Sequence, residues 1–242
     1  MPLPHCILPF SAPCRRAVFL SRHKRFTVRA RALDGPDAGQ ELLAHTNNTG
    51  TMLGLLRPES QALLSPAANP ARKLPYTLEA LALDRGWVGV NTLTPNRMLY
   101  AAWQAGALPE AVGYDRFKKE AVTGDSRLDA RLDGPDGPLW VECKNVTLVE
   151  EDVALFPDAE TARGRKHLHE LMRLKASGAR VALFFLVQRP DGRCFGPADV
   201  IDPEYATLFY EALSVGVEAW PYVAHVDEAG ITLGERLKVV RP

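Results

Sequence analysis

Short runs of hydrophobic residues, each too brief for a typical helix, dominate the first third of the chain. Turn-forming stretches such as DGPDAG and NNTG separate these runs. Several short strands at close spacing are typical of a small barrel. We therefore predict an all-β domain over residues 10–84, built from the runs RRAVFL, RFTVRARAL, ELLAHT, QALLSPA and YTLEALAL.

The second of these runs shows a period of two. Alternation places Phe26, Val28 and Ala30 on the face that fills the predicted barrel. The opposite face is basic, and its members are Arg25, Thr27, Arg29 and Arg31. That basic face is either an ordinary solvated barrel surface or a surface that binds a polyanion.

Beyond residue 85 the pattern changes to helices that alternate with strands. Apolar residues recur at helical spacing between Thr94, a candidate N-cap, and Gly106. A second helix is predicted over 159–177 and a third within PEYATLFYEALSVG. The run RVALFFLVQ is apolar on both faces, as expected of a central strand covered on both sides. This order predicts an α/β domain over residues 85–242.

Two charged residues interrupt the apolar strand pattern LWVECKNVTL. They are Glu142 and Lys144, and charged side chains seldom lie in such strands unless they are paired or bound to a metal. The preceding turn, DGPDGP, favours a hairpin. A hairpin that is symmetric about the bond between residues 135 and 136 places Asp129 directly opposite Glu142.

Carboxylates opposed in this way have Cβ atoms roughly 4.5–5.5 Å apart and repel each other. A hard divalent cation between Asp129 and Glu142 removes that repulsion. Glu120, nine residues before Asp129, supplies a third acid. The alternative is an ordinary cross-strand salt network in which Arg127, Arg131 and Lys144 neutralise the acids.

Charge is balanced over the whole chain but is unevenly distributed. The sequence holds 29 basic and 29 acidic residues, yet residues 1–33 contain seven Arg or Lys and no Asp or Glu. This asymmetry indicates that the N-terminal part meets a polyanion. No apolar run approaches the ~18–20 residues of a membrane span. The four cysteines are scattered without CxxC pairs, which favours a reducing cytoplasm.

The stretch GDSRLDARL…LWVECKNVTL resembles the active core of the PD-(D/E)xK nuclease superfamily. Over nearly the whole chain, the sequence resembles the SfsA family of sugar fermentation stimulation proteins. The segments that carry this resemblance are HTNNTGTMLGLL, TPNRMLYAAWQAG, VECKNVTLVEEDVALFPDAETARGRKHLHEL and IDPEYATLFYEAL. Departures are mild: Thr46 and Asn47 replace a frequent Cys-Pro, and Cys143 replaces the usual Val.

The resemblance implies a two-domain α+β or α/β protein. An N-terminal OB-fold barrel would precede a nuclease-like α/β domain with a mixed sheet flanked by helices. DNA binding and a link to sugar-utilisation genes are implied as well. In a nuclease, Asp129 and Glu142, helped by Glu120, would bind Mg²⁺ or Mn²⁺. Lys144 would orient the attacking water or stabilise the charge that develops on phosphate.

Further basic and polar residues are candidates for contact with nucleic acid. Arg163, Lys166 and His167 fall on one stripe of the second predicted helix. Asn48 lies in the polar loop HTNNTG, and Arg127 lies beside the predicted acidic pair. Each of these positions is also compatible with a solvated surface or a tight turn, so the expected set comprises Arg25, Arg29, Arg31, Asn48, Arg127, Arg163, Lys166 and His167.

Three functions remain open from the sequence. The first is a metal-dependent nuclease that acts on DNA or RNA, and the second is a non-catalytic DNA-binding protein that modulates transcription. The third is a protein that binds a nucleotide or sugar phosphate. Intact Asp129, Glu142 and Lys144 favour the nuclease, because a pure binder has little reason to carry opposed carboxylates. The sequence leaves strandedness and oligomeric state open.

Overall fold

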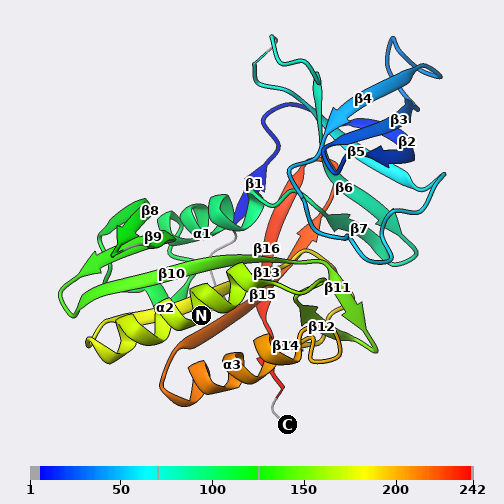
Figure 1. Ribbon diagram of the computed structural model, residues 1–242. Helices are drawn as coiled ribbons and strands as arrows, with labels where there is room; N and C mark the ends of the chain where they lie inside the picture. Colours follow the sequence, from blue (N-terminus) through cyan, green and yellow to red (C-terminus); the bar gives the residue numbers. More distant parts are fainter. Residues whose placement is uncertain (1–5, 70, 125, 241–242) are drawn as a thin grey trace.

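A computed structural model describes residues 6–69, 71–124 and 126–240. The chain forms two domains, and Figure 1 shows them in contact, with the β-barrel above the larger α/β domain. The described part of the chain begins with β1 (Ile7–Pro9) in the sheet of the α/β domain, then forms the barrel and then returns to the α/β domain. The barrel ends in the β6–β7 hairpin, whose last strand finishes at Gly89, and the first helix of the α/β domain begins at Thr94. The link between the domains is therefore short.

Five strands close the barrel, in the order β4-β3-β2-β5-β6, with a parallel pairing of β4 and β6 completing the circle. A sixth strand, β7, extends the sheet beyond β6. The closed five-stranded barrel is an OB fold, as the resemblance implied. Its strands are β2 (Arg15–His23), β3 (Thr27–Ala32), β4 (Glu41–His45), β5 (Gln61–Pro66), β6 (Tyr76–Leu83) and β7 (Gly86–Gly89).

The barrel core confirms part of the predicted alternation. Val28 and Ala30 are fully buried among the other apolar side chains of the barrel. The prediction was wrong for Phe26, whose side chain is 48% exposed. Strand β3 begins only at Thr27, so Phe26 belongs to the preceding turn and is not bound by the period of two. Its ring lies parallel to that of His45, at 6.3 Å between centroids.

A seven-stranded mixed sheet forms the centre of the α/β domain, in the order β1-β16-β15-β13-β10-β9-β8. Strands β10, β13 and β15 are parallel, and the other neighbours are antiparallel. Apart from its first residue, β13 is buried along its whole length, which confirms the predicted central strand. The members are β1 (Ile7–Pro9), β8 (Arg116–Thr123), β9 (Ser126–Gly134), β10 (Gly137–Val146), β13 (Arg180–Val187), β15 (Glu218–Val226) and β16 (Gly230–Arg236).

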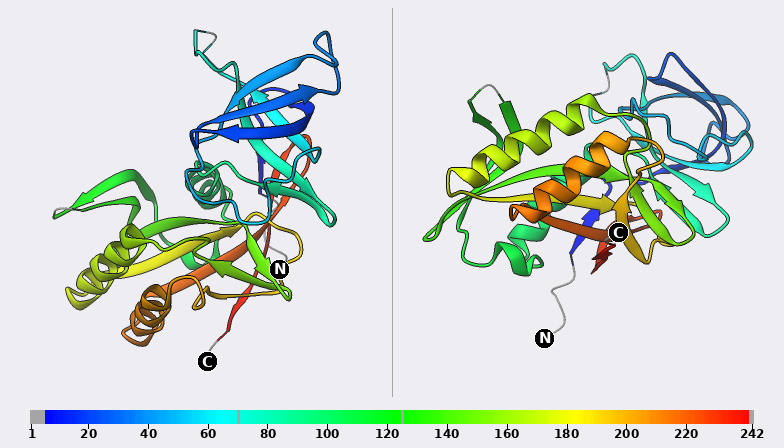
Figure 2. Two further views of the ribbon diagram at one scale, coloured as in Figure 1. Left: turned by 45° about the vertical axis from the view of Figure 1, so that its right-hand side comes forward. Right: turned by 60° about the horizontal axis from the view of Figure 1, so that its bottom comes forward.

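Helices cover both faces of this sheet. Helices α2 (Ala162–Ala176) and α3 (Pro203–Ser214) lie side by side on one face, as Figure 2 shows. Helix α1 (Thr94–Gln104) and the 3-10 helix η1 (Pro109–Ala111) pack on the other. Thr94, the predicted N-cap, is instead the first helical residue, and the N-cap position is Leu93.

A second, four-stranded sheet was not predicted from the sequence. It has the order β11-β12-β14-β17 and flanks the central sheet (Figure 1). Its strands are very short, so they leave little periodicity to detect. They are β11 (Leu148–Glu150), β12 (Val153–Phe156), β14 (Cys194–Pro197) and β17 (Lys238–Val239). Within the described ranges, no helix is long and apolar enough to cross a membrane.

Candidate active site and nucleic-acid groove

The β9–β10 hairpin has the register that its turn sequence predicts. Paired residues run from Gly134 opposite Gly137 to Ala130 opposite Val141. The backbone ladder ends there, one pair before Asp129. At the next position a side chain replaces the backbone partner: Oδ2 of Asp129 accepts a hydrogen bond of 2.8 Å from the backbone N–H of Cys143. The carboxylate is therefore held at the end of the ladder, beside the strand that carries Glu142.

A bend in β9 explains why the ladder stops at this point. Leu128 packs in the core beneath α2 and α3, whereas Ala130 packs in the core beneath α1. Residues two apart in a regular strand share a face, so the strand must turn at Asp129. On the neighbouring strand β8, Glu120 has a left-handed φ of 48°, and the β8–β9 pairing skips Glu120 and Asp129 without a change of register.

Asp129 is also held from the helical side. Its Oδ1 accepts a hydrogen bond of 2.6 Å from Nδ2 of Asn96, in the first turn of α1. Burial, and next the nearby charge of Glu142, raise the pKa of Asp129, while its hydrogen bonds oppose the rise less strongly. The charge of Glu142 thus adds to the effect of burial on the pKa of Asp129.

Glu142 occupies a more deeply buried position with two cationic or polar partners. Only 3% of the residue is exposed, and its Oε1 accepts a hydrogen bond of 2.7 Å from Nζ of Lys144. The same oxygen contacts Nδ1 of His167 from α2. Burial alone would raise the pKa of Glu142, but Lys144 and His167 outweigh it and hold the pKa at about 2. Glu142 is therefore ionised at neutral pH.

His167 lies beneath the site, not on the surface. The sequence placed it among the nucleic-acid contacts, yet it is 7% exposed, and its Nδ1 lies 3.1 Å from Nζ of Lys144. Helix α2 is turned so that His167 faces β10, while Lys166 points to solvent. This position suits a residue that orients Lys144 and Glu142.

Glu120, the third predicted acid, is not brought to the other two. It is exposed and pairs with Arg127 at 3.6 Å across the β8–β9 hairpin. Among the described residues, no three His, Cys, Asp or Glu side chains form a group that could hold one metal ion. The candidate metal ligands are therefore Asp129 and Glu142, with Glu120 and Arg127 as a separate surface pair.

A groove with a volume of about 800 Å³ lies where the barrel meets the α/β domain. Lys144 opens onto it, although its side chain is only 10% exposed. Three predicted contacts, Arg25, Asn48 and Arg163, line the same groove. The sequence could not show that these residues share a groove, because Arg163 lies more than 100 positions from the other two. Other residues of the lining are Arg22, Asn47, Thr49–Thr51, Asn145 and Phe156–Thr161.

Two arginines of the barrel that were predicted to contact nucleic acid pair with acidic side chains instead. Arg29 makes a bidentate ion pair with Glu41, with distances of 2.6 and 2.7 Å. Arg31 donates to Glu59 at 2.9 Å. Neither arginine lines the groove. For these two residues the structure favours the ordinary solvated surface, which the sequence had left open.

The barrel loop over residues 46–52 is fixed to the rest of the groove by hydrogen bonds. The Arg22 guanidinium donates to the carbonyls of Asn48 and Gly50, at 2.7 and 2.9 Å. From the α/β side, Oδ2 of Asp158 accepts from the backbone N–H of Met52 at 3.0 Å. Arg22 and Asp158 left no signal in the sequence, because their partners are backbone groups. Both rims of the groove are thus held in place.

A chain of buried amides links the two domains beneath the groove. Glu79, buried in the barrel, accepts a hydrogen bond of 2.8 Å from Asn91. Asn91 in turn accepts one of 2.7 Å from Asn47. Gln188 donates to the Asn91 carbonyl at 3.4 Å and to the side chain of Asn145. Asn145 directly follows the lysine of the site, so this chain positions the barrel against β10.

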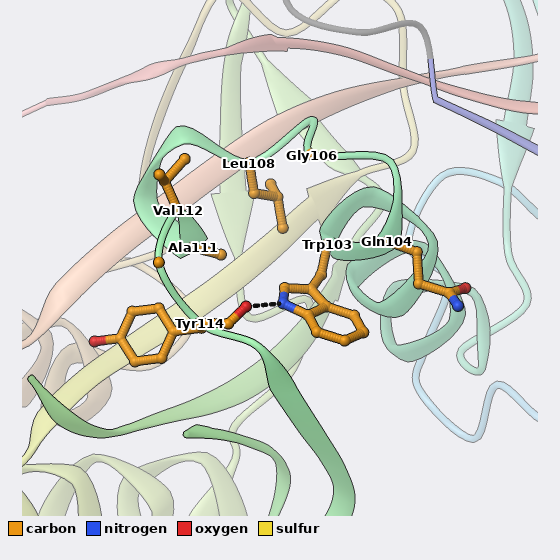
Figure 3. A pocket seen from close by; sticks show the side chains of 8 residues that line it. Trp103, Gln104, Gly106, Leu108, Ala111, Val112 and Tyr114 are labelled. Atoms are coloured by element: carbon orange, nitrogen blue, oxygen red, sulfur yellow. Dashed lines mark hydrogen bonds between the residues drawn. The ribbon is translucent and has the colours of Figure 1, made fainter. Parts of the chain in front are cut away.

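A second hollow, of about 440 Å³, lies between the end of α1 and the start of β8 (Figure 3). Its wall is fixed by a hydrogen bond of 3.0 Å from the Trp103 indole to the Tyr114 carbonyl. Its lining contains no carboxylate, histidine, lysine or cysteine. This hollow therefore offers no acid–base or metal-binding chemistry.

The architecture defines a class: an OB barrel joined to an α/β domain whose hairpin presents Asp, Glu and Lys beside a groove. Two family models match the chain in the same order. The SfsA N-terminal OB domain matches residues 20–90, and the sugar fermentation stimulation protein RE domain matches residues 93–230. The chain belongs to the SfsA family.

Relatives match over almost the whole chain. A sugar fermentation stimulation protein homolog of Syntrophobacter fumaroxidans is 58% identical over 234 residues, covering 97% of this chain and 88% of the relative. One from Maridesulfovibrio salexigens is 59% identical over 227 residues, covering 93% of each. The solved structure of Pyrococcus furiosus SfsA in complex with Ca²⁺ has a TM-score of 0.89 and 27% identity, covering 98% of this chain and 99% of its own.

Proposed function

We propose that this protein binds nucleic acid in the groove and hydrolyses its phosphodiester bonds with the help of a divalent metal ion. One observation carries the proposal. Asp129 and Glu142 are held beside Lys144, and Lys144 lines a groove that is also lined by arginines from the OB barrel. A phosphate chain held by those arginines would pass directly over the lysine.

The donor set fits a hard divalent cation such as Mg²⁺ or Mn²⁺. Asp129 and Glu142 would hold it, because such ions take one or two carboxylates and complete their shell with water and substrate oxygens. Burial, and next the charge of Glu142, raise the pKa of Asp129, and a bound cation would relieve the repulsion between the two carboxylates. Ca²⁺, which is bound to the Pyrococcus furiosus relative, is a cation of the same hard class. When bound, such an ion polarises phosphate and lowers the pKa of its water.

The protein's own residues would divide the remaining work. Lys144, held by Glu142 and His167, would present its ammonium group to the phosphate and stabilise the negative charge of the transition state. Arg25 and Arg163 would hold the chain by its phosphates, while Arg22 keeps the loop over residues 46–52 in place. Asn96 keeps the Asp129 carboxylate in position.

The test is cleavage of labelled single- and double-stranded DNA and RNA, with Mg²⁺, Mn²⁺ or EDTA. We expect metal-dependent cleavage that Asp129→Ala and Lys144→Ala each abolish, while circular dichroism shows a retained fold. A folded Lys144→Ala protein that cleaves as fast as the wild type would exclude the assigned role. Arg163→Ala, which leaves the three site residues intact, should instead weaken binding.

A non-catalytic nucleic-acid-binding protein that modulates transcription of sugar-utilisation genes is the second candidate. The observation that favours it is the closed pairing of Lys144 with Glu142, which occupies one proton of the ammonium group. Tight binding without cleavage under every metal condition would support this candidate over the nuclease.

A further inference from the structure

The turn between β2 and β3 has residues that its backbone does not favour. Lys24 and Arg25 both adopt left-handed conformations, with φ of 48° and 63°. Gly, Asn and Asp tolerate this region, whereas other side chains are strained in it. With Arg22 and His23, these residues form an uninterrupted basic stretch over 22–25. Local stability alone would select a different turn sequence.

Directly after these cations, the turn exposes a flat aromatic ring. Phe26 is 48% exposed, although large apolar side chains usually lie in the core. Its ring lies nearly parallel to the imidazole of His45 on β4, with 6.3 Å between the centroids and an angle of 8° between the rings. Exposed aromatic rings are the groups on which OB domains stack nucleobases.

The turn is firmly placed at the end of the groove. Nε of Arg22 donates to the Arg25 carbonyl at 3.0 Å, and its other nitrogens hold the loop over residues 48–50. Arg25 lines the same groove as Lys144. A polymer that lies in the groove therefore passes the turn on its way out.

We infer that this turn is a subsite for an unpaired base of single-stranded nucleic acid. The base stacks on Phe26, and Lys24 and Arg25 bind the phosphates on either side. A base inside a duplex is already stacked and cannot present its face to Phe26, so the subsite selects single strands. This inference rests on the proposed function, since it requires a nucleic acid in the groove.

The test is fluorescence anisotropy with single-stranded DNA and RNA of one mixed sequence and with the corresponding duplexes. Phe26→Ala should weaken single-strand binding roughly tenfold, as expected for loss of one stacked base. It should also reduce the preference for single strands over duplex, whereas Phe26→Trp should restore both. Leu33→Ala is the matched control, because Leu33 is 46% exposed and lies at the opposite end of the hairpin; it should bind as the wild type does.

The double variant Lys24→Asn/Arg25→Gly separates function from stability. It relieves the backbone strain, so the melting temperature should rise by about 2–4 °C, while single-strand affinity and its salt dependence should fall. The matched control is Glu151→Asn in the β11–β12 turn, because Glu151 is also left-handed, with a φ of 47°. It should raise the melting temperature without lowering affinity.

Three results would overturn the inference. Phe26→Ala could bind single strands as well as the wild type, or it could lose affinity for duplex to the same extent. Lys24→Asn/Arg25→Gly could gain stability without losing affinity. In each case wild-type binding to the groove would remain, so the proposed function would stand. If the wild type bound neither DNA nor RNA, the proposed function would fail together with this subsite.

Discussion

The two walls of the groove are built on opposite principles. On the α/β wall, Glu142, Lys144 and His167 are almost entirely buried and are paired with one another. On the barrel wall, Arg25 is exposed, and the exposed Phe26 follows it on the same turn, which is held through its backbone. Buried paired charges keep a fixed geometry, whereas exposed cations remain available to a ligand.

Because of this difference, we expect substitutions on the two walls to affect different properties of the protein. A change on the α/β wall removes a group whose partners cannot reach water, so it should damage chemistry and stability together. A change on the barrel wall removes a group that is already solvated, so it should damage affinity alone. The following predictions test that division, beginning with the largest expected effect.

Glu142→Gln removes the charge at the centre of the α/β wall. We expect cleavage to fall by at least about 100-fold, since Lys144 loses its counterion and the proposed cation loses a ligand. Affinity for nucleic acid without metal should not fall, because a negative charge near the groove has been removed. Single-turnover kinetics and anisotropy measure the two effects. Glu211→Gln on the exposed surface of α3 is the control, and equal losses in both variants would refute the division.

The pH dependence of stability should report on Glu142. Its pKa of about 2 in the folded protein lies below the ordinary value of 4.5. The ionised group therefore stabilises the fold above pH 4.5, and this stabilisation, roughly 2–3 kcal/mol, should disappear as the pH falls towards 2. Asp129, whose pKa is raised, acts in the opposite sense and favours folding when it is protonated. Thermal melts of wild type and Glu142→Gln should differ at pH 7 and converge at low pH; a constant difference would contradict the assignment.

Gly89→Ala tests the link that holds the two walls together. A Cβ at this position would lie 2.1 Å from Oε1 of Gln188, which is fully buried. The amide must move away from Asn145, so we expect a loss of about 1–3 kcal/mol in the free energy of unfolding. Denaturant titration measures the free energy of unfolding of Gly89→Ala, Gln188→Ala and the double variant. The double variant should lose less unfolding free energy than the sum of the two single losses. If the losses simply add, the contact between position 89 and Gln188 does not matter for stability.

The smallest effect distinguishes two arginines within the barrel. Arg25→Ala should weaken nucleic-acid binding several-fold and reduce the slope of log K against log salt by about one. Arg29→Ala should have little effect, because its guanidinium already pairs with Glu41 away from the groove. Equal losses from both variants would extend the binding surface to the face of the barrel outside the groove, where Arg29 lies.

Local features were predictable because the groups that define them are close in sequence. The register of β9 with β10 follows from a short turn and from alternating side chains, so Asp129 and Glu142 could be placed side by side. The bend at Asp129 was not predictable, since it depends on packing against α1 on one face and α2 on the other. Glu120, which has a left-handed φ, instead pairs with Arg127 on the surface.

Residues that serve the site through long-range contacts left no local signal. Asn96 reaches Asp129 across 33 positions, and His167 reaches Lys144 across 23. Phe26 was assigned to the core, because a period of two cannot reveal that a strand starts one residue later. Such errors arise where tertiary contacts outweigh a local pattern.

The sequence by itself determined the order of the two domains, the central strand β13 and the hairpin that carries Asp129, Glu142 and Lys144. Short-range turn chemistry and the burial of apolar faces are enough to specify these features. Only the tertiary structure decided which cations face the groove, because that depends on how the barrel docks on the α/β domain. Arg29 pairs with Glu41 on the surface, whereas Arg25 lines the groove. Only contacts between distant segments distinguish these two arginines.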